Sequence, residues 1–287
     1  MTTSATKTLA IAGFGDLGER LLTQFDPQIW KVVGLRRSAD AVPSPAEGIA
    51  VDFGRPESLK VLAGLKPDAL VVTLSPSDRS EEGYRRGFTD AMDAILSGLG
   101  DHRPSKAFFV SSTRVYGEQH GNWVDEDGEL SETDPRSKAI LDAERLLLET
   151  IPGSCVLRAG GLYGNEPGYL IRRVRSGDFT AERPPRFGNR IHRDDLAAFI
   201  AYATEIRVEP RIINLVDDDP APIQEVEGWL AQALGVAYEP PEPESDSSPP
   251  SHKRISNRLL RSTGFAPRFP SFREGYQEAV RRALADA

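Results

Sequence analysis

The chain has 287 residues, enough for one large domain or for a nucleotide-binding domain with a smaller partner, and we expect the second arrangement. Charged residues make up 27%, hydrophobic residues 39%, and the formal net charge is −8. A net negative charge disfavours binding to nucleic acid phosphates, so no nucleic acid partner is expected. The single cysteine, Cys155, excludes an internal disulfide, and its apolar surroundings predict a buried, inert thiol.

The N-terminal residues, MTTSATK, lack the apolar core of a signal peptide. No run in the sequence approaches the roughly 18 apolar residues that a membrane span needs. We therefore expect a cytoplasmic protein without membrane contact. The sequence also lacks a Cys and His cluster with zinc-binding spacing, so no metal is expected.

Short apolar runs alternate with helical periodicity through the first half of the chain. Residues 8–13 predict a strand, and residues 17–25 place apolar side chains at helical spacing. Further strands are expected at residues 31–35, 49–53, 69–74, 107–112 and 155–160, and helices at residues 80–99 and from residue 135. Apolar strands separated by amphipathic helices predict an α/β fold, a doubly wound parallel sheet of the Rossmann type.

The pattern becomes looser in the second half. A strand is expected at residues 212–216, and a helix at residues 223–235 that closes at its glycine. The Pro-, Ser- and acid-rich segment 238–252 predicts an exposed, mobile loop. We expect a nucleotide-binding domain at residues 1–160 and a smaller, partly interleaved substrate domain at residues 161–287, with this loop near its mouth.

The glycine-rich stretch GFGDLG directly follows the first expected strand and opens the first helix. It fits G-x-G-x-x-G, which is weak evidence alone but stronger in this strand-to-helix setting. Gly13 permits a tight turn, Gly15 the close approach of a pyrophosphate, and Gly18 the packing of helix on strand. Asp16 and Leu17 complete this candidate dinucleotide cradle. A glycine-rich turn without a ligand is the alternative.

The second expected strand ends in GLRRS, where NAD-binding proteins usually carry an acid for the ribose 2′-hydroxyl. Arg36 and Arg37 can instead hold a 2′-phosphate through charge-assisted hydrogen bonds, and Ser38 can add a hydroxyl contact. We therefore predict NADP as the cofactor, with NAD as the second choice. A solvated basic turn is the alternative. Asp52, after the third strand, is predicted to face the adenine or else to be an ordinary turn acid.

Further motifs are distributed along the rest of the chain: VSSTRVYG, LRAGGLYG, NRIHRDDLAAFI, NLVDDDPAP and KRISN. Together with the glycine-rich turn and Lys138, they resemble the short-chain dehydrogenase/reductase superfamily. The resemblance is closer to its NAD-dependent epimerase/dehydratase group of extended and atypical members, and it covers nearly the whole chain. It implies hydride transfer between a nicotinamide cofactor and a small carbonyl, hydroxyl or sugar-like substrate.

In that family a Ser or Thr, a Tyr, and a Lys four residues after the Tyr form the catalytic set. The resemblance places the Ser at Ser112, which would orient a substrate oxygen, and the Lys at Lys138, which would hold the nicotinamide ribose. The position of the Tyr is occupied by Asp134, so the chain departs from the family pattern. Dehydratase members carry an acid pair where this chain has Thr113 and Arg114, which argues against sugar-nucleotide dehydration.

Asp134 has a structural explanation, because an Asp followed by Pro135 favours the start of a helix. An aspartate is ionised at neutral pH and cannot donate a proton unless it is strongly desolvated. Three other groups could donate instead: Tyr116, Tyr163 and His192, the last because an imidazole titrates near neutral pH. Each has a simpler alternative, packing for the tyrosines and a loop-fixing hydrogen bond for the histidine.

Basic side chains are candidates for binding an anionic substrate group. They are Arg158, Arg172, and, after the proline-rich segment, Lys253 and Arg254, with ordinary surface arginines as the alternative. Thr113, beside the candidate catalytic Ser, is a further candidate substrate contact.

The motifs together predict an NADP-dependent oxidoreductase or epimerase that acts on a small molecule. The alternative is a non-catalytic NADP(H)-binding redox sensor or regulatory protein, which kept the cradle after the phenol was lost. By analogy with extended family members, a homodimer would pair through the helices at residues 80–99 and 135–149.

Overall fold

The computed structural model describes residues 6–164, 168–181, 186–206, 208–209, 211–242 and 252–285. The chain forms two compact units whose segments alternate along the sequence. The first unit comprises Met1–Val115, Leu130–Arg158 and Ala197–Ile213, and the second comprises Tyr116–Glu129, Ala159–Leu196 and Asn214–Ala287. Two segments lie across the boundary expected at residue 160, because Tyr116–Glu129 belongs to the second unit and Ala197–Ile213 to the first.

A seven-stranded sheet forms the frame of the first unit. Its strands are β1 (Lys7–Ala12), β2 (Trp30–Arg36), β3 (Glu47–Ala50), β4 (Ala69–Val72), β5 (Lys106–Ser112), β7 (Ser154–Ala159) and β10 (Ile212–Leu215). Their order is β10-β7-β5-β4-β1-β2-β3, so the order reverses between β1 and β4. β1 pairs in parallel with both β2 and β4. The predicted doubly wound Rossmann sheet is confirmed.

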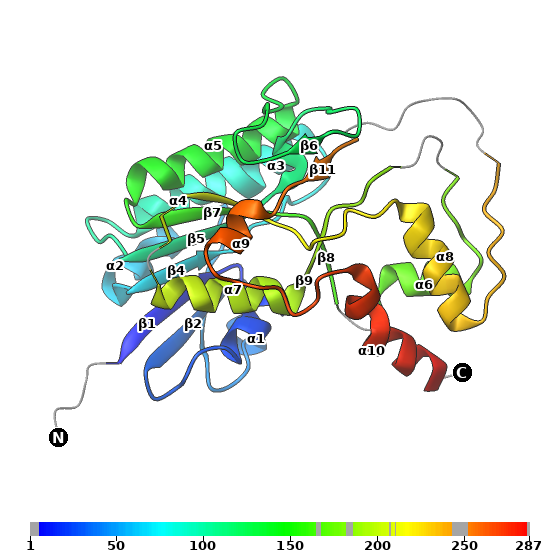
Figure 1. Ribbon diagram of the computed structural model, residues 1–287. Coiled ribbons are helices and arrows are strands. Elements are labelled where there is room, and N and C mark those ends of the chain that lie inside the picture. The colour runs from blue at the N-terminus through cyan, green and yellow to red at the C-terminus, as the bar shows by residue number, and fades with distance from the viewer. Residues whose placement is uncertain are drawn as a thin grey trace. The chain divides into compact units, whose positions relative to one another are not determined.

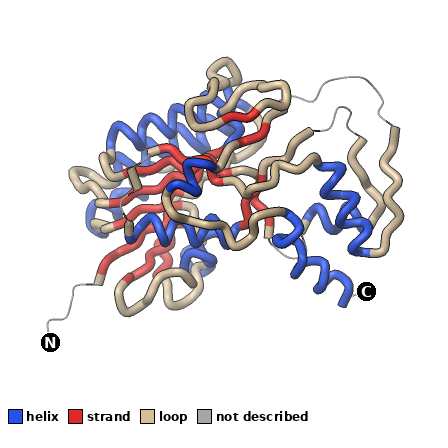
Figure 2. The backbone as a smooth tube through the Cα atoms, in the orientation of Figure 1, coloured by secondary structure: helices blue, strands red, loops and turns tan. Residues whose placement is uncertain are grey.

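Helices cover both faces of this sheet. They are α1 (Asp16–Leu22), α2 (Val61–Leu65), α3 (Glu81–Tyr84), α4 (Ala91–Gly98), α5 (Pro135–Thr150) and α7 (Arg193–Glu205). Figure 1 shows α4 and α5 on one face and α1 and α7 on the other, and Figure 2 shows the strands between these two helical layers. β4 is buried along its whole length, as expected for a strand with helices on both sides.

Two predicted elements differ in detail from the observed ones. The helix expected at residues 80–99 contains a π-helical segment, Arg85–Asp90, between α3 and α4. The strand expected at residues 49–53 ends earlier because the chain turns at Asp52. The Asp52 carboxylate accepts the backbone N–H of Gly54 at 3.0 Å, a local contact that favours a turn over continued pairing.

The described part of the second unit contains two small parallel sheets and four helices. β6 (Trp123–Val124) pairs with β11 (Arg254–Ile255), and β8 (Gly161–Tyr163) pairs with β9 (Arg190–His192). The helices are α6 (Tyr169–Arg175), α8 (Ile223–Leu234), α9 (Arg258–Ser262) and α10 (Phe272–Ala285). The glycine stop predicted for the α8 region is confirmed, because Gly235 caps this helix with a φ of 70°.

Several expectations concern features that the structure describes only in part. Within the proline-rich segment 238–252, residues 243–251 lie outside the described residues. Among the residues that are described, no helix is long and apolar enough to cross a bilayer. The same residues contain no group of three or more His, Cys, Asp or Glu that could hold a metal ion. Cys155 is buried, and burial raises the pKa of its thiol to about 12, as an inert thiol requires.

Candidate functional site

A cavity of about 910 Å³ lies in the first unit, at the carboxyl ends of β1, β2 and β4. It is lined by the turn after β1, the end of β2, the turn 52–54, the stretch 73–78 after β4, and residues 86, 87 and 91. The sheet order reverses between β1 and β4, and open α/β sheets bind their ligands at such a point. The cavity is therefore the candidate ligand site.

Gly13 forms the tight turn at the base of this cavity. Its φ is 94°, and a Cβ there would lie 2.4 Å from the Thr73 carbonyl oxygen. The Thr73 hydroxyl donates to the Gly13 carbonyl oxygen at 2.6 Å, which joins the turn after β1 to the end of β4. Only glycine fits this backbone conformation and this close approach, so the predicted role of Gly13 as a turn residue is confirmed.

The remaining residues of the GFGDLG stretch divide into two groups. Gly15 lines the cavity, whereas Asp16, Leu17 and Gly18 are absent from its lining. A Cβ at Gly18 would lie 2.8 Å from the ring of Phe14, which is only 2% exposed. Gly18 therefore makes room for the buried Phe14 ring, and the sequence pattern alone did not indicate this packing.

The end of β2 brings its basic residues to the same cavity. Arg36, Arg37 and Ser38 all line it. The Arg36 Nη1 atom donates to the Ala41 carbonyl oxygen at a long 3.4 Å, and Arg37 makes no hydrogen bond or ion pair with any described residue. Neither guanidinium group is held by a carboxylate in the described structure, so both can receive an anion. Asp52 lines the cavity after β3, and its carboxylate also accepts the Gly54 N–H in the turn, so the predicted adenine contact stays a prediction.

Ser112 and Lys138 lie at the ends of two different elements of the first unit. Ser112 ends β5, and its hydroxyl oxygen accepts the backbone N–H of Arg114 at 3.1 Å. Lys138 lies in the first turn of α5, where its ammonium group donates to both carboxylate oxygens of Asp142 at 2.9 and 2.7 Å. Thr113 follows Ser112 and is buried, with 9% exposure.

Asp134 caps α5, as its position before Pro135 predicted. Its carboxylate accepts the backbone N–H of Ser137 at 3.2 Å, the Ser137 hydroxyl at 2.7 Å and Arg114 Nη2 at 3.1 Å. Burial alone raises its pKa, but the hydrogen bonds from Ser137 and Arg114 outweigh burial, so the pKa lies below its ordinary value. Asp134 is therefore ionised at neutral pH and does not replace the tyrosine as a proton donor.

Tyr116 belongs to a buried hydrogen-bond network in the second unit. Its hydroxyl donates to the Asn214 side-chain oxygen at 2.6 Å, and the Asn214 amide donates to the Ser256 carbonyl oxygen at 3.3 Å. Lys253, only 5% exposed, donates to the Tyr116 carbonyl oxygen at 2.6 Å. Three of the sequence motifs, VYG, NLV and KRISN, thus meet here. These contacts argue against Lys253 as a substrate anchor.

The other predicted substrate anchors are engaged in different ways. Arg254 donates through Nε to the Gly121 carbonyl oxygen at 2.7 Å and lies over the Trp123 ring. Arg158, 2% exposed, donates through Nη2 to Glu144 at 2.8 Å. Burial and this ion pair argue against Arg158 as a substrate anchor. Arg172 is exposed on α6, which agrees both with a substrate anchor and with an ordinary surface arginine.

Tyr163 and His192 pack against each other in the second unit, with ring centroids 5.2 Å apart. The Tyr163 hydroxyl donates to the Ser271 carbonyl oxygen at 3.3 Å, and burial raises the pKa of this phenol. The His192 Nδ1 atom accepts the backbone N–H of Asp194 at 3.2 Å, so a neutral His192 carries its proton on Nε2. Both tyrosine hydroxyls are thus held by protein acceptors.

Asp217, which sequence analysis did not single out, is a buried carboxylic acid in the NLVDDDPAP turn. It is 2% exposed, and its Oδ2 atom has no hydrogen-bond partner among the described residues. Burial raises its pKa to about 8 despite the attraction of Arg190. In the unfolded chain this carboxyl group loses its proton near pH ~3.9. The contribution of Asp217 to the free energy of unfolding is therefore fully present below that pH and is lost as the pH rises through about 8.

Asp217→Asn is therefore expected to stabilise the protein at alkaline pH. The amide keeps Oδ1, which accepts the Asp219 N–H at 3.3 Å, and removes the charge. We expect a gain in unfolding free energy of more than ~1 kcal/mol at about pH 9 and almost none at about pH 4, measured by urea unfolding. The exposed Asp40→Asn is the control and should change neither value. An equal gain at both pH values would show a packing effect and contradict the titration.

Sequence analysis missed the β4 side of the cavity. Thr73, Asp78 and Arg86 line it but were not predicted as site residues. Their position at and after the end of ALVVTL was an available signal, because β4 also directs its carboxyl end to the site.

Comparisons with known proteins agree with this architecture. No family model matches the chain. Protein YeeZ of Escherichia coli is 29% identical over 282 residues, which cover 92% of this chain and 97% of the relative. The solved structure of a candidate NAD-dependent epimerase/dehydratase from Methylobacillus flagellatus is 33% identical, with a TM-score of 0.80, and the match covers 98% of this chain and 100% of that chain.

A UDP-glucose 4-epimerase from Thermus thermophilus, solved with NAD, shares the fold at 18% identity. Its TM-score is 0.79, and the match covers 98% of this chain and 100% of that chain. The similarity to the Methylobacillus flagellatus protein covers 98% of this chain, so it includes residues of both units. The chain therefore belongs to the NAD-dependent epimerase/dehydratase family of extended short-chain dehydrogenases/reductases.

Proposed function

We propose that the protein is an NADP-dependent oxidoreductase or epimerase that acts on a small carbonyl, hydroxyl or sugar-like compound. The observation that carries this proposal is the cavity at the ends of β1, β2 and β4, with Arg36 and Arg37 in its lining. An acid at the end of β2 would favour the 2′-hydroxyl of NAD, whereas two guanidinium groups that no described carboxylate binds favour a 2′-phosphate.

The residues of the cavity fit a dinucleotide. The backbone at Gly13 and Gly15 leaves room for a pyrophosphate, because neither residue places a side chain in the turn. Arg36, Arg37 and Ser38 would hold the 2′-phosphate, and Asp52 would face the adenine. The volume of about 910 Å³ falls within the usual range of ligand sites, about 300–1,000 Å³.

The bound nicotinamide would supply or accept the hydride. Ser112 would bind the substrate oxygen: its hydroxyl oxygen accepts the N–H of Arg114, which leaves the hydroxyl proton to donate. Lys138 would hold the nicotinamide ribose through an ammonium group that Asp142 keeps in place. Tyr116, Tyr163 and His192 remain the candidate proton donors.

A cofactor titration followed by a turnover assay tests this function. We expect calorimetry to give tighter binding of NADPH than of NADH. We also expect NADPH oxidation with some member of an aldehyde, ketone and sugar-nucleotide panel, and Ser112→Ala should lower kcat at unchanged NADPH affinity. Comparable affinities for the two dinucleotides would refute the NADP preference. Binding of NADPH without any turnover would instead favour the non-catalytic sensor, and no binding at millimolar concentration would exclude both.

A further inference from the structure

A third arginine reaches the cavity from the side opposite Arg36 and Arg37. Arg86 belongs to the π-helical segment Arg85–Asp90 and lines the cavity together with Gly87. A Cβ at Gly87 would lie 2.6 Å from the Pro76 Cα atom, so only glycine lets this segment pack so closely on the stretch after β4. π-helical segments are rare and frequently occur at functional sites.

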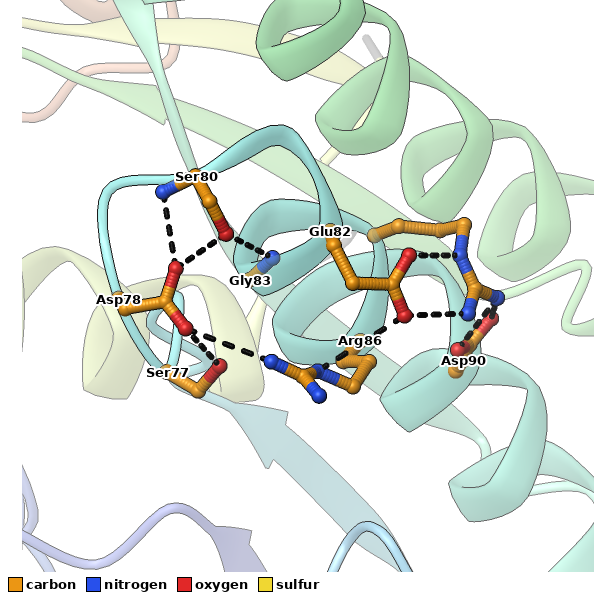
Figure 3. A network of polar contacts seen from close by, with 8 residues as sticks. Ser77, Asp78, Ser80, Glu82, Gly83, Arg86 and Asp90 are labelled. Atoms are coloured by element: carbon orange, nitrogen blue, oxygen red, sulfur yellow. Dashed lines mark hydrogen bonds and ion pairs between the residues drawn. The ribbon is translucent and has the colours of Figure 1, made fainter.

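Asp78 forms an ion pair with Arg86, as Figure 3 shows, and both residues line the cavity. The Oδ1 atom of Asp78 accepts the Ser80 backbone N–H at 2.8 Å and also the Ser80 hydroxyl. The Oδ2 atom accepts the Ser77 hydroxyl at 3.3 Å and Arg86 Nη2 at 3.4 Å. The hydrogen bonds from Ser80 lower the pKa of Asp78, so it carries its charge at neutral pH.

The neighbouring arginine is bound much more firmly. Arg85 forms a two-bond fork with Glu82 at 3.0 and 2.8 Å and donates to Asp90 at 2.7 Å. Among the described residues, Arg86 has a 3.4 Å contact with Asp78 and a 3.9 Å contact between its Nε and Glu82, and no further polar partner. Both of these contacts are longer than a good charge-assisted hydrogen bond, about 2.7–2.9 Å. A phosphate could therefore displace Asp78 at little cost.

The sheet order indicates which phosphate Arg86 would contact. β1 lies between β2 and β4, so the glycine turn after β1 is the middle of the cavity floor. Arg36 and Arg37 come from the β2 side, where the 2′-phosphate is expected. Arg86 follows β4, whose end is joined to the glycine turn by the Thr73 to Gly13 hydrogen bond. The phosphates nearest to this turn are those of the pyrophosphate.

We propose that Arg86 is a pyrophosphate-binding residue that Asp78 masks in the free protein and releases when the dinucleotide enters. This inference rests on the proposed dinucleotide function. Because the pyrophosphate is common to NAD and NADP, Arg86 contributes to the binding of both and does not distinguish between them. Asp78 opposes binding, because its bond to Arg86 must be broken first.

Calorimetric titration of four variants with NADP and NAD tests the assignment. Arg86→Gln is expected to weaken the binding of both dinucleotides equally, by about tenfold. Asp78→Asn keeps Oδ1 as an acceptor for Ser80 but removes the oxygen that accepts from Arg86. This variant should bind both dinucleotides about two- to fivefold more tightly. In the double variant the Asp78→Asn gain should disappear. Arg79→Gln, which removes the same charge from an exposed residue of this loop outside the cavity lining, should bind like the wild type.

Thermal unfolding of each variant checks that the fold is kept. If Arg86→Gln binds both dinucleotides as the wild type does, the assignment of Arg86 is wrong while the proposed function stands. A loss for NADP alone would assign Arg86 to the 2′-phosphate and overturn the pyrophosphate contact. If Asp78→Asn still tightens dinucleotide binding in the double variant, Asp78 repels the dinucleotide directly, and the proposal that it masks Arg86 is wrong. A wild-type protein that binds neither dinucleotide would refute the proposed function, and this inference with it.

Discussion

Replacing both Arg36 and Arg37 by Gln is expected to lower the affinity for NADPH by about 100-fold and to leave that for NADH within about threefold. Both side chains line the cavity, and no described carboxylate is bound to either. Each charge-assisted contact with the 2′-phosphate is worth about tenfold, and NADH lacks that group. Arg36 makes only a 3.4 Å hydrogen bond to Ala41, so the fold should persist.

Two smaller ligands test the contact of Arg36 and Arg37 with the 2′-phosphate separately from the rest of the dinucleotide. Binding of 2′,5′-ADP should weaken in the Arg36→Gln, Arg37→Gln variant as much as that of NADPH, whereas binding of 5′-AMP should not change. Arg55→Gln is the matched control, because Arg55 is exposed near the same cavity and absent from its lining. Equal losses for NADPH and NADH would contradict a 2′-phosphate contact and would instead indicate general charge attraction.

The sheet and the cradle could be predicted from the sequence because their determinants are local. Strands such as β4 are apolar at every position, and only strands covered on both faces need that composition. Gly13 follows such a strand, and its φ of 94° is the conformation that a glycine permits. The start of α5 was equally local, because Asp134 caps the helix that Pro135 begins.

The partners of charged residues could not be predicted in this way. Lys253 binds the carbonyl oxygen of Tyr116, which is 137 residues away in sequence, and nothing near Lys253 indicates this partner. Arg158 was predicted as one of several basic candidates for binding an anionic substrate group, but the structure pairs it with Glu144. The helical spacing of residues 80–99 also did not indicate the π-helical segment that brings Arg86 to the cavity.

Arg158 stabilises the fold through its buried ion pair with Glu144. Arg158→Met is therefore expected to lower the free energy of unfolding by about 3–5 kcal/mol. The side chains of Arg158 and Glu144 are 2% and 3% exposed, and they join β7 to α5. Glu144 also accepts the Ser111 hydroxyl from β5 at 2.5 Å. Removing the guanidinium leaves the carboxylate buried and uncompensated, which costs more than the pair contributes. Urea unfolding at neutral pH measures the change.

A second variant distinguishes the loss of the ion pair from the cost of leaving the Glu144 carboxylate buried without a partner charge. Replacing Arg158 by Met and Glu144 by Gln together removes both charges, so it should recover most of the loss, because Gln keeps an oxygen for Ser111. Arg85→Met breaks an exposed ion pair on the same unit and should cost less than about 1 kcal/mol. If the double variant is as unstable as Arg158→Met alone, the cost lies in lost packing of the guanidinium. The Arg158 and Glu144 pair would then stabilise the sheet through shape rather than through charge.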